Sequence, residues 1–236
     1  MNAHVLLRDF HRAREIAPYG DDVEVGRVTR TIMAHGHAIL QSHKLGRTDR
    51  AHVEALLHYF DPPPGARVLD VGCGVGTVAA LMAEMRDDLR FTLLNISGAQ
   101  LEMAPDSMAK ARADMHALPF RRDSFDAVMF CYSLGHGLLD QCIGEAARVL
   151  RPGGVLFVYD LDTYDPYYLI DHLGYRPHSR GEMVDACRAH GFSPDFFVNP
   201  DGNTDDLISL IGAKAFSDLG FDRAEPIIYR FTKEAA

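Results

Sequence analysis

The chain has 236 residues, with 24 lysines and arginines against 33 aspartates and glutamates, and a formal net charge of −9. The basic residues are scattered, which argues against a polynucleotide partner, because duplex-binding proteins neutralise phosphates with clustered Lys and Arg. Hydrophobic residues make up 47% and charged residues 24% of the chain, which is typical of a globular domain and argues against global disorder.

The sequence also predicts a chain that stays in the cytoplasm. No stretch approaches the roughly 20 apolar residues that span a bilayer, so no membrane insertion is expected. The first residues, Met1-Asn2-Ala3-His4, lack the pattern of an export signal. The four cysteines have no CxxC spacing, which favours free thiols over a disulfide framework or a zinc site.

The first 60 residues predict a helical extension. A weak helical pattern runs over Val28–Leu40, and Thr48 can cap an amphipathic helix that ends at Phe60. The run Asp61-Pro-Pro-Pro-Gly65 cannot continue a helix. We therefore expect residues 1–60 to form a helical cover or lid over a domain of residues 61–236.

After the prolines, short apolar runs alternate with helical segments. Strands are expected at Arg67–Val71, Arg90–Asn95, Ala127–Tyr132, Val155–Tyr159, Asp195–Val198 and Pro226–Phe231. Helices are expected at Val75–Met85, Gly98–Lys110 (where Pro105 can kink or split it), Leu138–Leu150, Arg180–His190 and Asp205–Leu219. This alternation predicts a doubly wound, mostly parallel α/β sheet, with the last two strands paired differently.

The strongest motif is a glycine-rich turn between a strand and a helix. Asp70 ends the first strand, and Gly72, Gly74 and Gly76 follow at alternate positions. Glycines there permit a tight turn and let the backbone approach a ligand closely. The alternative is a glycine-rich turn that holds no ligand. The surrounding motifs decide between these two interpretations.

Those motifs follow in order. They are Asn95-Ile96-Ser97-Gly-Ala-Gln100, Asp114-Met115-His116-Ala-Leu-Pro-Phe120, and Arg148-Val-Leu-Arg-Pro-Gly-Gly154. With the glycine-rich turn they resemble class I S-adenosylmethionine-dependent methyltransferases over about residues 66–160. The resemblance implies a seven-stranded Rossmann-like sheet, an enzyme, and S-adenosylmethionine as cofactor, with residues 161–236 shaping the acceptor site. The cofactor-binding residues it implies are Asp70, Gly72, Cys73, Gly74, Gly76, Asn95, Ile96, Gln100, Asp114, Met115 and His116.

Two further residues are candidates for catalysis. Tyr132 and His136 follow the strand Ala127–Tyr132, and in open parallel sheets ligands bind beyond the carboxyl ends of the strands. Histidine has a pKa suited to proton transfer near neutral pH. The alternative is that His136 only hydrogen-bonds a loop. Tyr159-Asp160-Leu-Asp162, at the end of the next strand, is a second source of groups for the pocket.

The run His178-Ser179-Arg180-Gly-Glu182 opens a helix with a capping box, and such a start can also bind an anion. Together with the Asn95 motif, it resembles prenyl-diphosphate C-methyltransferases of the geranyl diphosphate type. That resemblance implies an acceptor site that includes His178, Ser179 and Arg180. Tyr167, Tyr168, His35 and His37 are further substrate candidates, although a solvated helix is the alternative for the two histidines. A magnesium ion held through the diphosphate is an option, and no ligand of the metal is predicted.

The sequence therefore predicts a methyltransferase that acts on a small molecule. The acceptor that it favours is an alkene carbon of an isoprenyl diphosphate such as geranyl or isopentenyl diphosphate. One alternative is an O- or N-methyltransferase for a secondary metabolite. Another is a binding module that keeps the cofactor fold without catalysis. The helix Asp205–Leu219 can line either the pocket or an interface between copies of the chain.

Overall fold

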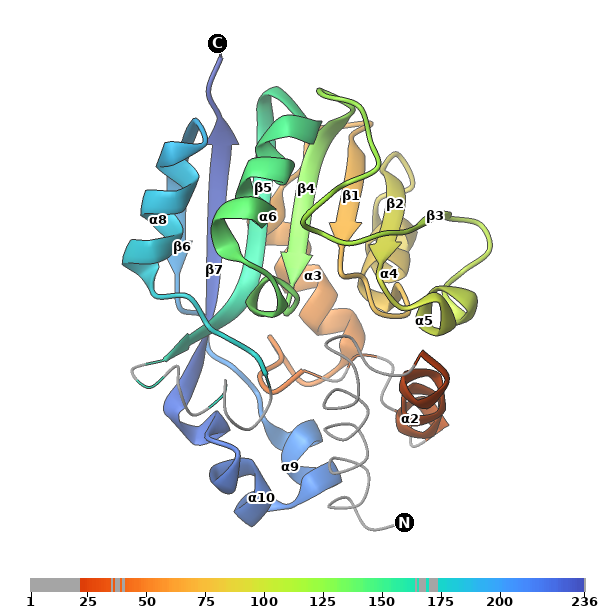
Figure 1. Cartoon of the computed structure of the whole chain (residues 1–236). Helices are drawn as coiled ribbons and strands as arrows, with labels where there is room; N and C mark the ends of the chain where they lie inside the picture. Colours follow the sequence, from red (N-terminus) through yellow and green to blue (C-terminus); the bar gives the residue numbers. More distant parts are fainter. Residues whose placement is uncertain are drawn as a thin grey trace.

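The computed structural model describes residues 22–34, 36, 39, 41–163, 165, 169 and 174–235, and they build an α/β sheet with helices on both faces (Figure 1). Its seven strands lie in the order β3-β2-β1-β4-β5-β7-β6. They are β1 (Arg67–Val71), β2 (Arg90–Asn95), β3 (Ala109–Arg112), β4 (Phe125–Cys131), β5 (Leu150–Thr163), β6 (Phe192–Val198) and β7 (Ala224–Lys233). Strands β1 to β5 pair in parallel, and β7 runs antiparallel to both β5 and β6. The predicted fold class and the different pairing of the last strands are confirmed.

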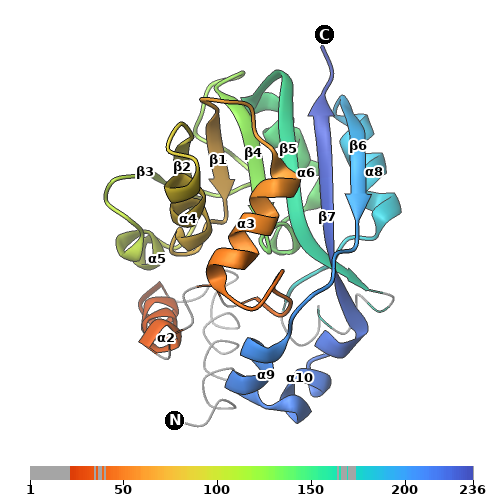
Figure 2. The same ribbon diagram turned by 180° about the vertical axis from the view of Figure 1, so that it is seen from behind.

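Helices cover both faces of this sheet. Figures 1 and 2 show α3 (Asp49–Phe60) and α4 (Thr77–Met85) on one face, and α6 (Leu139–Val149) and α8 (Arg180–Ala189) on the other. Three helices lie beyond the carboxyl ends of the parallel strands: α2 (Asp22–Ala34), α9 (Asp205–Ile211) and α10 (Ala213–Asp218). The short helices α5 (Gly98–Met103), η1 (Leu134–His136) and η2 (Phe221–Arg223) complete the described fold. No helix of the described ranges combines the length and the hydropathy needed to cross a bilayer.

Helix α3 belongs to the main core, although it lies in the predicted extension. Thr48 caps it by accepting a hydrogen bond from the backbone N–H of Ala51 at 3.1 Å. Val53, Leu56 and Phe60 are buried against the sheet, and the Phe60 ring lies 5.0 Å from that of Phe157 on β5. Helix α3 therefore fixes where the chain between α2 and β1 crosses the end of the sheet.

Two predicted helices are wrong in part. The helix expected over Gly98–Lys110 ends at Met103, and Ala109–Arg112 forms the edge strand β3. This strand is only four residues long, Ala-Lys-Ala-Arg, and it lies at the edge of the described sheet, so it carries no large apolar side chain that would mark it as a strand. The helix expected over Asp205–Leu219 is split at Gly212, whose φ of 86° and ψ of 150° break the helical path.

Candidate active site

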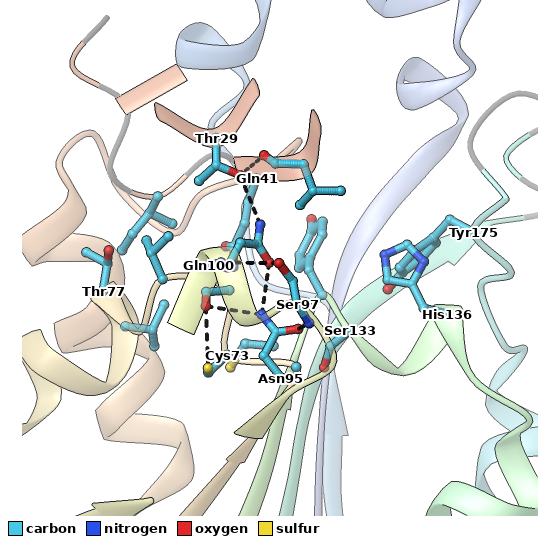
Figure 3. Close-up of a pocket in the computed structure, with 18 of the residues that line it drawn as sticks. Thr29, Gln41, Cys73, Thr77, Asn95, Ser97, Gln100, Ser133, His136 and Tyr175 are labelled. Atoms are coloured by element: carbon cyan, nitrogen blue, oxygen red, sulfur yellow. Dashed lines mark hydrogen bonds between the residues drawn. The ribbon is translucent and has the colours of Figure 1, made fainter. Parts of the chain in front are cut away.

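A cavity of about 610 Å³ opens at the carboxyl ends of β1, β2 and β4. It reaches from the glycine-rich turn after β1 to helices α2 and α9 (Figure 3). Of the residues predicted from sequence, it is lined by Asp70, Gly72, Cys73, Gly74, Asn95, Ile96, Gln100, Asp114, Met115, Tyr132 and His136. The fold thus brings eleven predicted site residues to one cavity.

The glycine-rich turn is held tightly against its neighbours. The backbone N–H groups of Gly72 and Cys73 donate to the Leu94 carbonyl at the end of β2, at 2.8 and 3.1 Å. A Cβ on Gly72 would lie 2.5 Å from Cβ of Ser133, so only glycine fits there. Gly74 differs, since a Cβ there would meet no atom within 4 Å. The wall at Gly74 is therefore open towards the cavity.

Asp70 is the buried charged group of this wall, with 2% of its surface exposed. No described group donates a hydrogen bond to its carboxylate, and burial raises its pKa from 3.8 to about 7. An isolated buried carboxylate is costly unless a positive charge or a donor comes to it. Asp70 is therefore suited to a cationic ligand.

Asn95 is the centre of a hydrogen-bond chain that crosses the cavity wall. Its side-chain NH₂ donates to the Gly74 carbonyl at 3.1 Å and to Oε1 of Gln100 at 2.9 Å. Nε2 of Gln100 donates in turn to the Thr29 hydroxyl on α2 at 3.1 Å. Figure 3 shows this chain running from the glycine-rich turn to the helix that covers the cavity.

Helix α2 is also fixed at its first residue. The Asp22 carboxylate accepts hydrogen bonds from the Ser97 hydroxyl at 2.7 Å and from the backbone N–H of Gly98 at 3.1 Å. Arg112 adds an ion pair at 3.1 Å, and these contacts lower the pKa of Asp22 despite its partial burial. The side of α2 that carries Val25 and Thr29 is thereby held over the cavity.

Asp114 is oriented by the residue two positions later. Its Oδ1 accepts from the backbone N–H of His116 at 2.9 Å and contacts Nδ1 of the same residue at 2.5 Å. Nε2 of His116 accepts from the backbone N–H of Leu138 at 2.8 Å, so Nδ1 carries the proton and donates. His116 lies behind the wall of the main cavity and positions Asp114, which lines it.

Tyr132 faces the cavity from the end of β4 with a φ of 54°. Ser42, another lining residue, donates its hydroxyl to the Tyr132 hydroxyl at 3.3 Å. Beside them, His43 is buried, and this burial lowers its pKa to about 4, so its imidazole is neutral at physiological pH. Burial likewise raises the pKa of the Tyr132 phenol, which therefore keeps its proton.

Lys44 anchors this loop. Its buried ammonium group forms ion pairs with Asp49 and with Asp206, the latter at 2.6 Å. Its backbone N–H donates to the Asn203 carbonyl at 2.8 Å. The loop that carries Gln41 and Ser42 is therefore tied to α3 and to the start of α9.

His136 lies on η1, on the same cavity wall as Tyr175. The two rings meet edge to face, with 4.7 Å between their centroids and 88° between their planes. Figure 3 shows both side chains together at one side of the cavity. Tyr132 and His136 thus both line the cavity, as the sequence predicted.

The rest of the described cavity wall is mostly apolar. Its aliphatic and aromatic members include Val25, Ile32, Met33, Ile39, Leu161, Leu207, Leu210, Ile211 and Phe221, and Thr29, Gln41 and Ser42 are among its neutral polar groups. None of the described lining residues is a lysine or an arginine. Helix α9 lines this compartment through Leu207 and Ile211. Of the two roles that the sequence allowed for Asp205–Leu219, a pocket wall or an interface, the structure shows the pocket wall.

Residues 69–158 match a family model described as a methyltransferase domain. This part of the chain is a class I S-adenosylmethionine-dependent methyltransferase domain. The structure contains the mostly parallel sheet and the glycine-rich turn between β1 and α4 that the sequence predicted.

Known relatives agree with that assignment. A sterol 24-C-methyltransferase from Yarrowia lipolytica is 33% identical over 186 residues, or 72% of this chain and 43% of the relative. A 27-O-demethylrifamycin SV methyltransferase from Amycolatopsis mediterranei is 42% identical over 107 residues, or 41% and 39%. A geranyl diphosphate C-methyltransferase from Streptomyces coelicolor A3(2), solved with Mg²⁺, geranyl diphosphate and S-adenosyl-L-homocysteine, superposes with a TM-score of 0.71 at 16% identity and covers 92% and 98% of the two chains.

The chain spans only 33–46% of the length of the curated relatives it matches. The relatives include both C- and O-methyltransferases. The matches therefore establish the methyltransferase domain and leave the acceptor to the geometry of the cavity.

The cavity of the methyltransferase domain fits S-adenosylmethionine. The open wall at Gly74 leaves room for a ligand against the backbone, and the unpaired carboxylate of Asp70 suits the positive charges of the cofactor. Asp114 presents an oriented carboxylate at the same wall. Two predicted cofactor residues do not line the cavity. Gly76 begins α4, where a Cβ would lie 2.7 Å from Leu93, and His116 acts through Asp114.

The predicted anion site at His178, Ser179 and Arg180 is not brought to this cavity. The Ser179 side chain accepts from the Glu182 backbone and Glu182 accepts from the Ser179 backbone in a capping box, while His178 is buried near the backbone of Leu134. Arg180 stacks on Phe197 at 4.5 Å and donates to Asn199 at 2.9 Å. The capping prediction is confirmed. None of the three residues belongs to the described lining of this cavity, so their assignment to the acceptor site stays a prediction.

Four substrate candidates, namely His35, His37, Tyr167 and Tyr168, lie outside the described residues. Within the described ranges, no group of three or more His, Cys, Asp or Glu side chains is placed to hold a metal ion.

Several lining residues were not identified from the sequence. They are Thr29, Gln41, Ser42, Tyr175 and Phe221. None belongs to a recognisable motif, and they come from four separate parts of the chain. Tyr175 lies three positions before His178 in the sequence. Only its packing against η1 shows that it lines the cavity.

Proposed function

We propose that the chain transfers a methyl group from S-adenosylmethionine to an alkene carbon of an isoprenoid small molecule. The observation that carries the proposal is the form of the cavity. One continuous space joins the glycine-rich turn to a compartment with aliphatic and aromatic walls and neutral polar groups. Such a compartment favours a hydrocarbon chain over a charged metabolite.

The cofactor supplies a methyl group that is already electrophilic, so the protein's main task is to align the acceptor. As the π electrons of the alkene form the new carbon–carbon bond, the methyl–sulfur bond breaks and its electrons stay on sulfur. The acceptor is left with a carbocation, which the aromatic faces of Tyr132 and Phe221 can stabilise. Loss of a proton from the adjacent carbon restores an alkene, and His136 is the candidate base.

The sequence predicted a prenyl diphosphate as the acceptor, and the Streptomyces coelicolor structure holds geranyl diphosphate with Mg²⁺. The described lining residues, which contain neither lysine nor arginine, favour an acceptor whose buried part is uncharged. A diphosphate would need an anchor that the described lining does not supply. The candidates predicted from the sequence are His178, Ser179 and Arg180, with His35 and His37.

The test is a panel of acceptors incubated with S-adenosylmethionine, with and without EDTA. Geraniol and a sterol represent neutral isoprenoids, while geranyl and isopentenyl diphosphate represent charged ones. We expect a product heavier by one methylene from a neutral isoprenoid, with or without EDTA. Turnover confined to the diphosphates and lost with EDTA would establish the prenyl diphosphate reaction instead, and turnover of no isoprenoid would refute the proposal.

O-methylation is the second candidate. The observation in its favour is His136 on the cavity wall, since an imidazole there can remove the proton of a hydroxyl as oxygen attacks the methyl group. The rifamycin relative is named for such a reaction. Phenols and secondary alcohols therefore belong in the same panel, and NMR of the product distinguishes a carbon-bound from an oxygen-bound methyl group.

A further inference from the structure

Behind the His136 ring lies a buried pair formed by Tyr175 and Asp160. The Tyr175 ring meets that of His136 edge to face at 4.7 Å. Its hydroxyl donates a short hydrogen bond to Oδ1 of Asp160, at the end of β5. Both members of the pair are buried, with 6% and 3% of their surfaces exposed. A continuous contact therefore connects the sheet to the imidazole at the cavity wall.

The place of the Tyr175 ring is closely determined. A Cβ on Gly135 would lie 2.5 Å from Cε1 and Cζ of the ring, so the ring packs directly on the backbone of η1. The backbone N–H of Arg176 donates to the Gly135 carbonyl at 2.8 Å. The Tyr175 ring therefore packs against η1, which carries His136, and the phenol is held at its far end by Asp160.

Asp160 also interacts with the backbone. The backbone N–H of Leu161 donates to its Oδ1 at 2.7 Å, and the backbone of Gly135 on η1 also stabilises the ionised carboxylate. A buried carboxylate is costly unless such interactions satisfy it. An apolar side chain at this position could pack, but it would bind neither the Tyr175 hydroxyl nor the backbone of η1, so the carboxylate connects both to β5.

We propose that Asp160 and Tyr175 are positioning residues, which hold the His136 imidazole in the orientation needed to accept a proton from the acceptor. The assignment of that proton transfer to His136 rests on the proposed function, while the orientation of the ring does not. The carboxylate fixes the phenol, the phenol fixes the ring plane of His136, and Gly135 permits the close approach. Because a displacement of about 1 Å can cost on the order of 100-fold in rate, losing the hydroxyl is expected to slow the reaction without removing the base.

The first measurement needs no substrate. Protein labelled with ¹⁵N-histidine gives ring resonances, and the signal lost in His136→Gln identifies His136. In Tyr175→Phe, which keeps the ring and loses its hydrogen bond, we expect the His136 resonances to shift and broaden. Tyr59→Phe is the matched control, because Tyr59 packs on Phe196 on the α3 face of the sheet and should leave the His136 signal unchanged.

The second measurement uses the acceptor found with the panel. Tyr175→Phe is expected to lower kcat roughly 10-fold or more with less than about a twofold change in KM. Asp160→Asn should retain most of the rate and the wild-type His136 resonance, since the amide oxygen still accepts from the phenol. If Tyr175→Phe does not fold, Asp160→Val replaces it, because it removes the acceptor and the buried charge together.

Wild-type resonances and rate in Tyr175→Phe, or in Asp160→Val, would overturn the positioning role. Shifted resonances in a protein that turns over no isoprenoid would instead confirm the orientation of His136 and refute the proposed function. The two proposals can therefore fail separately.

Discussion

Asp70 offers a sharp test of how the cofactor site is built, because its carboxylate should destabilise the empty protein. Burial raises its pKa from 3.8 to about 7. Below pH 3.8 the Asp70 carboxyl is protonated in both the folded and the unfolded state and does not destabilise the fold. As pH rises through 7, the free energy of unfolding falls, because the buried group must ionise. The rise of about three pKa units corresponds to a loss of about 4 kcal/mol in the free energy of unfolding at alkaline pH, at about 1.4 kcal/mol per unit.

Asp70→Asn removes this titration while keeping the shape of the side chain. Relative to wild type, its free energy of unfolding should increase by about 3 kcal/mol between pH 5 and pH 8, since about two pKa units are lost in that interval. Urea denaturation at both pH values measures the difference. Other titrating groups, Asp160 among them, are common to the two proteins and cancel. The exposed Asp87→Asn is the control variant for a change from Asp to Asn at the surface, measured at the same two pH values.

The same variant should bind S-adenosylmethionine at least about 10-fold more weakly by calorimetry, because the positive charges of the cofactor lose their carboxylate. A stability difference that is equal at pH 5 and pH 8 would refute the argument, since it would mean that the Asp70 carboxylate is not isolated from solvent. Unchanged cofactor affinity would separately remove Asp70 from the binding site.

Three further changes test other parts of the cavity. Gly74→Val places a branched side chain in the open wall at a φ of 58°, so calorimetry should show at least about 10-fold weaker cofactor binding; unchanged affinity would mean that the turn does not face the cofactor. Asn95→Asp replaces the NH₂ that bonds Gly74 and Gln100 with an oxygen, and urea denaturation should show a loss of about 1–3 kcal/mol. His136→Ala should lower kcat on the identified acceptor by about 100-fold, and a retained rate would leave His136 with a structural role only.

Much of the cofactor half could be predicted from the sequence. The residues from Asp70 to Gly76, and the motifs at Asn95 and Asp114, are local signals, because the turn geometry and the strand ends that they need are encoded within a few residues. The capping box at Ser179 is local in the same way and is confirmed. The edge strand β3 gave no such signal, since its short, half-exposed sequence becomes a strand only by pairing with β2.

The acceptor half was decided by tertiary structure. Arg180 follows a predicted anion-binding helix start, yet it stacks on Phe197 because β6 lies beside α8, and no local pattern indicates which way a helix start faces. Tyr175 and Ser42 are 133 positions apart in the sequence and meet at one cavity because η1, the loop before α3 and helix α9 converge beyond the sheet.

The sequence by itself predicted the fold class and the cofactor and fixed the acidic character of the chain, since each follows from composition or from short-range geometry. The lack of lysine and arginine in the described cavity wall was decided only when distant segments packed together. The net charge of −9 describes the whole chain, whereas binding of the acceptor depends on the few side chains that the fold places around it.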